Sequence, residues 1–239
     1  MKRLLCVLFA VSLLLTGCND ATNSNAPSNT DSENHSTYYV DRVSVDKMAY
    51  YFNDVCFGGE YTAGLTKQNI TKWQDPIMLY IDGVATMTDY EVLTDFLDFL
   101  NNIDGFPGIM QIFDKSQANL IVNFCGQAQF VAETNLADAD GFATFNYSNE
   151  TFVITNGKVY IRTDINQTDR SSVLQEELYQ ILGPTKDTLV RKDSIIYQRS
   201  NPEKLSAEDK SIISLLYNTR ITPGMTATES EEIIREIYY

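Results

Sequence analysis

Residues 19–37 contain almost no apolar side chains, and this segment limits which part of the chain can fold. Asn, Ser, Thr and Asp make up most of it. Such a composition buries too little surface to offset the loss of chain entropy, so we expect a disordered tether over residues 18–38. The sole histidine, His35, lies in this tether. What remains, residues 39–239, has the size of one globular domain.

The first residues, 1–17, have the pattern of an export signal. Lys2 and Arg3 precede an apolar run that is too short to span a bilayer as a mature helix. The run ends in Leu-Thr-Gly-Cys18, which resembles the lipobox of bacterial lipoproteins, where the cysteine receives lipid and becomes the new N-terminus. We therefore expect lipid on Cys18 and a protein anchored to the extracytoplasmic face of the cell membrane. The alternative is an ordinary secretory signal with a chance cysteine.

The charge of the chain limits its partners. The formal charge is −14, and loss of Lys2 and Arg3 with the signal takes it to −16. A surface this acidic repels nucleic acid and anionic lipid, so we expect no nucleic-acid partner. The simplest role of the charge is solubility outside the cell.

Two cysteines stay in the folded region, because Cys6 leaves with the signal and Cys18 carries the lipid. In an exported protein, Cys56 and Cys125 can form a disulfide. The alternative is two buried thiols that behave as small hydrophobic side chains. The sequence leaves both possibilities open.

The folded region alternates between strand and helix patterns, which predicts a single α+β or mixed α/β domain. Ile77–Ile81 and Asn119–Phe124 have the pattern of buried strands. Between them, Thr88-x-x-Glu91 has the pattern of a capping box, followed by apolar residues at helical spacing. Residues 40–56 fit either a helix or a strand.

Further strands and helices follow. We expect strands at Gly141–Tyr147, Thr151–Ile154 and Lys158–Arg162, with a hairpin at Asn156-Gly157. A helix is expected over about 171–182, and two more helices follow it to the C-terminus. The capping residues that we expect for these three helices are Ser172, Ser206 and Thr226, and Gly183 with Pro184 ends the first of them.

Residues 174–183 read LQEELYQILG and have the spacing of the zinc-protease helix, H-E-x-x-H-x-x-G, with both histidines replaced. In that helix, two histidines one turn apart bind one zinc ion and the glutamate polarises a zinc-bound water. Here Glu176 and Gln180 hold the histidine positions, Glu177 holds the glutamate position, and Gly183 keeps the turn.

The third ligand position falls at Lys186, with Asp187 beside it. Further on, Asp193–Tyr197 resembles the S-I-M-x-Y methionine turn of the metzincins, with Ile196 in place of methionine. Leu205–Tyr217 resembles the closing helix of the matrixins. Together these resemblances imply a metzincin-like, or zincin-like, single domain with a small mixed sheet, an active-site-type helix and a C-terminal helical part.

A wider resemblance is to a bacterial exported family called domain of unknown function 2927, and it covers about residues 57–226. It implies that the two glutamates and Gln180 are typical of the family, and it implies a fold and a compartment without a reaction. The pieces that carry it are Ile70–Ile77, Glu176–Gly183, Asp193–Ile195 and Leu216–Met225.

The residues at the ligand positions do not favour zinc, which prefers histidine and thiolate. Glu176 and Gln180 share a helix face, and their oxygens suit calcium or magnesium better. Lys186 near that face would repel a cation and can pair with Glu176. We therefore expect no metal and no cofactor.

Glu177 has two interpretations. It can be a buried carboxylate bonded to the backbone or to an arginine, for which the candidates are Arg162, Arg170 and Arg220. It can instead line a substrate groove, where a raised pKa would suit a general acid or base. Tyr197 is expected in the core or groove wall, and Asp187 as a loop cap.

The sequence thus predicts a membrane-anchored lipoprotein with a degenerate metzincin-like domain, a pseudo-metalloprotease without the zinc histidines. We expect noncatalytic binding of a peptide, a protein or a cell-wall component in the former cleft. The alternative is a peptidase-like hydrolase that uses Glu177 as general base, with or without an oxygen-liganded metal. A third possibility is a structural protein of the cell envelope.

Overall fold

The computed structural model describes residues 43–58, 67–199 and 202–238. The expected signal, the tether and Cys18 lie outside the described residues. The chain divides into Met1–Asn34 and His35–Tyr239, and only the second unit contains described residues. In the described ranges, no helix combines the length and the hydropathy needed to cross a bilayer.

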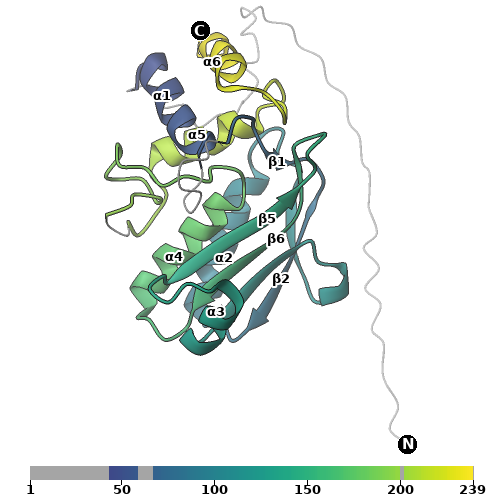
Figure 1. The fold of residues 1–239 in the computed structure, drawn as a ribbon, viewed down its shortest axis with the longest axis vertical. Helices are drawn as coiled ribbons and strands as arrows, with labels where there is room; N and C mark the ends of the chain where they lie inside the picture. The colour runs from purple at the N-terminus through teal and green to yellow at the C-terminus, as the bar shows by residue number, and fades with distance from the viewer. Residues whose placement is uncertain (1–42, 59–66, 200–201, 239) are drawn as a thin grey trace, which may run out of the picture. The chain divides into compact units, whose positions relative to one another are not determined.

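A mixed six-stranded sheet forms the centre of the domain (Figure 1). Five strands run parallel in the order β1-β6-β4-β2-β3, and β5 pairs antiparallel with β6. The strands are β1 (Lys72–Trp73), β2 (Ile77–Gly83), β3 (Ile109–Ile112), β4 (Leu120–Cys125), β5 (Gly141–Tyr147) and β6 (Val153–Arg162).

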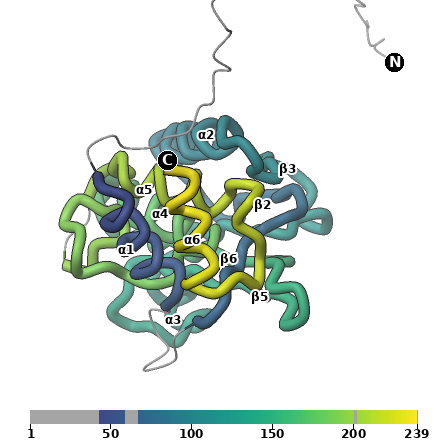
Figure 2. The backbone as a smooth tube through the Cα atoms, turned by 90° about the horizontal axis from the view of Figure 1, so that it is seen from above, coloured from purple at the N-terminus to yellow at the C-terminus, as the bar shows by residue number. Residues whose placement is uncertain are grey.

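Helices cover both faces of the sheet. Two long helices, α2 and α4, lie on one face, α3 packs on the other, and α1 lies beside α5 and α6 (Figures 1 and 2). This arrangement confirms the predicted α+β single domain with a mixed sheet and a C-terminal helical part. The helices are α1 (Val45–Cys56), α2 (Met87–Asn101), α3 (Gln127–Thr134), α4 (Gln167–Gln180), α5 (Ala207–Tyr217) and α6 (Ala227–Ile237).

The possible disulfide between Cys56 and Cys125 does not form, and both residues are buried free thiols. Cys56 on α1 belongs to the main core, whereas Cys125 at the end of β4 packs with Phe130 and Tyr160 on the α3 face of the sheet. Burial raises the pKa of the Cys56 thiol to about 12, although nearby Lys67 opposes the shift. Because the thiolate is the reactive form, this cysteine is chemically inert in the folded protein.

The predicted hairpin at Asn156-Gly157 is wrong, because both residues lie inside the continuous strand β6. The chain turns instead at residues 148–152, where the Phe152 N–H donates to the Ser148 carbonyl (2.7 Å). Gly157 serves packing. A Cβ atom there would lie 2.8 Å from Cδ1 of Ile181, so a side chain at this position would displace the Ile181 side chain at the end of α4.

The helix starts also differ in part from the prediction. Helix α4 begins earlier than expected, with Asn166 as its N-cap accepting from the Asp169 N–H. Ser172 lies inside α4, and its hydroxyl donates to the Pro202 carbonyl (2.7 Å). Helix α2 is capped by Thr86, two residues before the predicted position, with Asp89 completing the capping box. The predicted caps of α5 and α6, Ser206 and Thr226, are confirmed.

The C-terminal end of α4 has its carbonyl groups satisfied by side chains from distant segments. Carbonyls at a helix end have no partner within the helix, and leaving them unbonded in a core is costly. Three donors from the β1 region and from α5 supply the bonds. They run from Trp73 Nε1 to Ile181 O (2.9 Å), from the Tyr217 hydroxyl to Leu182 O (2.9 Å) and from Lys67 Nζ to Gly183 O (2.8 Å).

The helix ends at Gln180 with Ile181 as its C-cap, earlier than predicted, and Gly183 lies in the turn that follows, where the backbone requires glycine. Its φ of 133° lies in a region that side chains disfavour. A Cβ atom there would also lie 2.5 Å from the Thr71 carbonyl oxygen. The turn after α4 is therefore pressed against the segment that leads into β1.

Lys72 in β1 performs a similar role at the end of α5. Its ammonium group donates to the carbonyls of Leu216 (2.8 Å) and Ile221 (2.5 Å) and lies 5.4 Å from the centre of the Tyr217 ring. The side chain is only 5% exposed, and burial lowers its pKa to about 8. A cation at a helix C-terminus is favourable, but here desolvation outweighs that effect.

We expect the stability contributed by Lys72 to rise with pH. Its pKa of about 8 in the folded state lies below the unfolded value, so the unfolded chain binds more protons between these two values. The difference in unfolding free energy between wild type and Lys72→Met should therefore grow by about 2 kcal/mol from pH 8 to pH 10. Urea unfolding at the two pH values measures it. A difference that shrinks with pH would contradict the assignment.

Candidate functional site

Helix α4 directs Glu177 toward the edge strand β5. The side chain is 5% exposed, and a Cβ atom on Gly141 would lie 2.7 Å from its Oε1 atom and 2.3 Å from Cγ1 of Val173. Glycine at the start of β5 therefore lets this strand lie directly against the buried carboxylate. Glu176 is half-buried on the neighbouring face of α4.

Gln180 bonds to the loop that follows the helix. Its amide donates to Asp187 Oδ1 (2.9 Å), so Asp187 accepts a side-chain bond across the turn. The predicted pairing of Lys186 with Glu176 is wrong. Lys186 Nζ lies 2.6 Å from Asp54 Oδ1 of α1, and the Thr188 hydroxyl donates to the other oxygen of Asp54 (2.7 Å).

The residues at the three zinc-ligand positions do not fit zinc. They offer a carboxylate, an amide and an ammonium group, and the last two are engaged by Asp187 and Asp54. In the ranges described above, no cluster of three or more His, Cys, Asp or Glu side chains is placed to hold a metal ion. No catalytic step through a metal can be derived from this donor set.

The three arginines that were candidates to pair with Glu177 have other carboxylate partners. Arg170 is buried and pairs with Asp89 of α2 (3.0 Å). The other two arginines form three ion pairs nearer the surface. Arg162 contacts Asp140 (3.0 Å) and Asp164 (2.8 Å), and Arg220 pairs with Glu236.

Strand β5 has one open edge, because among the described residues it pairs only with β6. Its backbone groups alternate between β6 and this edge. The Arg162 N–H donates to the Asp140 carbonyl (3.0 Å), whereas the Gly157 N–H points the other way, to Asn119 (2.8 Å). With the β5–β6 register, this alternation places a set of backbone groups on the open edge. They belong to Gly141, Ala143 and Phe145.

Two pockets lie elsewhere on the domain. One of about 310 Å³ lies between α2 and residues 203–210, and one of about 240 Å³ lies between the sheet and α3. Neither is lined by Glu176, Glu177 or Gln180. We take the edge of β5 beside α4 as the candidate site, because the buried Glu177 lies against the start of this strand.

The segment that resembles the methionine turn is held under α4 by a buried charge pair. Arg191 Nη2 lies 2.6 Å from Asp209 Oδ1 of α5, with the two side chains 3% and 0% exposed. The Ser194 hydroxyl (2.7 Å) and the Ile195 N–H (2.8 Å) also donate to this carboxylate. Ile196 is fully buried, as a residue in the methionine position should be.

Tyr197 closes this segment. It is half-buried, and its residue bridges to Thr188 in a short parallel pairing just after Asp187. Arg191 is the structural residue that the sequence did not single out. In the sequence, Arg191 lies two residues before the Asp-Ser-Ile turn, and this position does not indicate a charge partner on α5.

The structure is a mixed-sheet domain in which α4 and the loop that follows it carry Glu176, Glu177, Gln180 and Lys186. The chain belongs to the family described as protein of unknown function (DUF2927), whose family model matches residues 45–236. No curated protein matches the chain.

Two solved structures of myroilysin are similar to the chain. One is 13% identical, with a TM-score of 0.40, and the match covers 62% of this chain and 98% of myroilysin. The other is 12% identical, also with a TM-score of 0.40, and the match covers 70% of this chain and 92% of myroilysin.

We expect Asp209→Asn to destabilise the domain by about 3 kcal/mol, because it leaves the buried Arg191 without its countercharge. Chemical denaturation measures the loss. Asp193→Asn, on the exposed side of the same turn, is the matched control and should change stability by less than about 0.5 kcal/mol. Equal effects of the two substitutions would show that the pair does not hold the turn.

Proposed function

We propose that this protein is a membrane-anchored bacterial lipoprotein whose metzincin-like domain binds an extended peptide without cleaving it. The peptide, from a protein or from the cell wall, adds a strand to the open edge of β5. The supporting observation is the set of outward backbone groups of Ala143 and Phe145, which are half-buried, on a strand that pairs only with β6 among the described residues.

Strand addition explains how such an edge would recognise a ligand. Main-chain hydrogen bonds supply affinity, and the side chains beside the edge select among sequences. Glu177 is buried against Gly141 at one end of the edge, and Tyr147 is 41% exposed at the other. A peptide on this edge would therefore run between a carboxylate end and an aromatic end.

The contacts of the α4 motif support binding without catalysis. A metal-dependent peptidase needs ligands that converge on one ion. Here the amide of Gln180 bonds to Asp187, and Lys186 pairs with Asp54. The motif thus serves to connect α4 to its following loop and to α1.

The anchor would position this edge at the cell surface. The lipid on Cys18 is the proposed membrane contact, and it holds the domain at the extracytoplasmic face. Tethering restricts the domain to ligands near the membrane, which raises their effective concentration.

A substitution at Ala143 tests whether a peptide binds at the open edge of β5. Ala143→Pro removes an N–H on the open side and leaves the β5–β6 hydrogen bonds intact. Peptides captured by the full chain from a display library of random sequences should bind this variant at least about tenfold more weakly, because they lose a backbone bond and the approach to the edge. Titration of each captured peptide measures the change.

Ala143→Ser is the matched control, since it keeps the N–H and is expected to bind like wild type. Unchanged affinity in the proline variant, with its fold intact by circular dichroism, would rule out strand addition at β5. Mass spectrometry of the captured peptides tests the hydrolase alternative. Cleavage by wild type that is lost in Glu177→Gln would replace the binding proposal with a catalytic one.

A further inference from the structure

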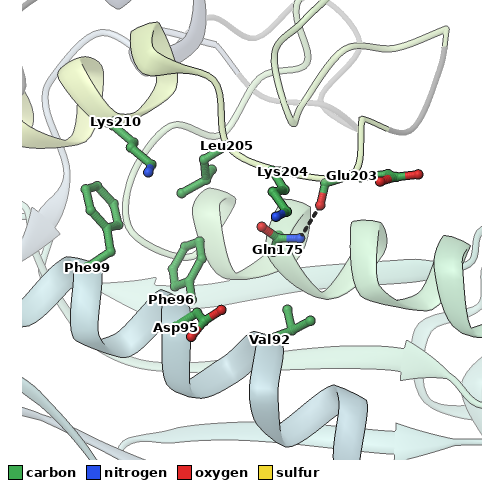
Figure 3. Close-up of a pocket in the computed structure, with 9 residues that line it drawn as sticks. All are labelled: Val92, Asp95, Phe96, Phe99, Gln175, Glu203, Lys204, Leu205 and Lys210. Carbon is green, nitrogen blue, oxygen red and sulfur yellow. Dashed lines mark hydrogen bonds between the residues drawn. The ribbon is translucent and has the colours of Figure 1, made fainter.

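The pocket between α2 and the segment before α5 is a second feature that needs a function. Four apolar side chains form its floor, and polar groups surround them (Figure 3). At about 310 Å³ it lies at the lower end of the range of small-molecule sites. The apolar residues are Val92, Phe96, Phe99 and Leu205.

This pocket is separate from the edge of β5. Gln175 lines it and donates to the Glu203 carbonyl (2.8 Å). Gln175 and Glu177 are two residues apart on α4, so their side chains leave the helix in nearly opposite directions. The helix therefore stands between the two places, and a ligand in the pocket does not touch Gly141.

The charges around the pocket favour an anion. Lys204 and Lys210 direct their ammonium groups into it, whereas the carboxylate of Glu203 points away (Figure 3). Lys210 Nζ lies 5.5 Å from the centre of the Phe99 ring. Neither lysine forms an ion pair within the described part of the chain.

Asp95 is the acidic side chain that remains at the pocket (Figure 3). Two inward ammonium groups against one carboxylate leave a local excess of positive charge. On a chain with a formal charge of −14, such an excess next to aromatic rings is a departure from the general surface. An anionic group would satisfy it.

We propose that this pocket binds a small apolar carboxylate. Its carboxylate pairs with Lys204 and Lys210, and its apolar group packs on Phe96 and Phe99. The C-terminal residue of a peptide and a free fatty acid share this chemistry, because both join a carboxylate to an apolar group. The proposal does not depend on peptide binding at β5.

Titration of the full chain followed by NMR tests the pocket. The probes are N-acetylphenylalanine, its uncharged amide and acetate. We expect the acid to bind about fivefold more tightly than the amide, with shifts at Phe99, Gln175 and Lys210, and acetate not to bind at the same concentrations. Equal binding of acid and amide, or no binding of the acid, would overturn the proposal. A parallel titration with octanoate distinguishes a peptide C-terminus from a free fatty acid. Tighter binding of octanoate than of N-acetylphenylalanine would assign the pocket to free fatty acids.

Three variants test which charged side chains contribute to binding of the acid. Lys210→Met keeps the length of the side chain and should weaken binding of the acid about fivefold. Asp95→Asn removes a repulsive carboxylate and should strengthen it by a few-fold. Lys192→Met is the matched control at an exposed lysine away from the pocket, and it should leave binding unchanged. If Lys210→Met and Asp95→Asn also bind the acid like wild type, the charged side chains of the pocket do not recognise the ligand, and the proposal is wrong.

Discussion

The carbonyl groups at the C-terminal end of α4 impose the constraint on which the rest of this fold depends. They end inside the protein, where an unbonded carbonyl is costly, so other segments must supply donors. Trp73 comes from β1 and Tyr217 from α5, and both donate to this end. One helix end thereby holds together segments that lie far apart in the sequence. The turn at Gly183 follows from the same arrangement, because Thr71 leaves no space for a side chain there.

This arrangement gives a physical reason for the sequence pieces that mark the family. The piece with Trp73 and the piece with Tyr217 both donate to the end of the piece Glu176–Gly183. The Asp-Ser-Ile turn joins the same assembly through Asp209. Each of these pieces supplies a donor, an acceptor or a turn to the same assembly. They therefore preserve a scaffold whether or not a metal is present.

Strands β2, β4 and β5 and helices α2, α5 and α6 followed from apolar spacing and capping residues, which act locally. Strands β1 and β3 and helix α3 were not predicted. The predictions were wrong where packing against a residue distant in the sequence overrode a local sequence signal. Asn156-Gly157 has the composition of a hairpin, but both residues lie inside β6, where Gly157 faces Ile181 at the end of α4. The possible pairing of Cys56 with Cys125 failed because the two thiols belong to separate hydrophobic clusters. The candidate residues of α4 were found, but the edge that Glu177 faces depends on strand order, which no single segment reveals.

Helix α4 separates two surfaces, because Gln175 lies on one side of the helix and Glu177 on the other. A ligand that shifts the helix on one side changes the geometry offered on the other. The effect of one ligand on the binding of the other is a coupling free energy. This coupling is reciprocal, so each ligand alters the affinity of the other by the same factor. Helix α4 would then transmit a change between two binding events, a role that depends on its rigidity.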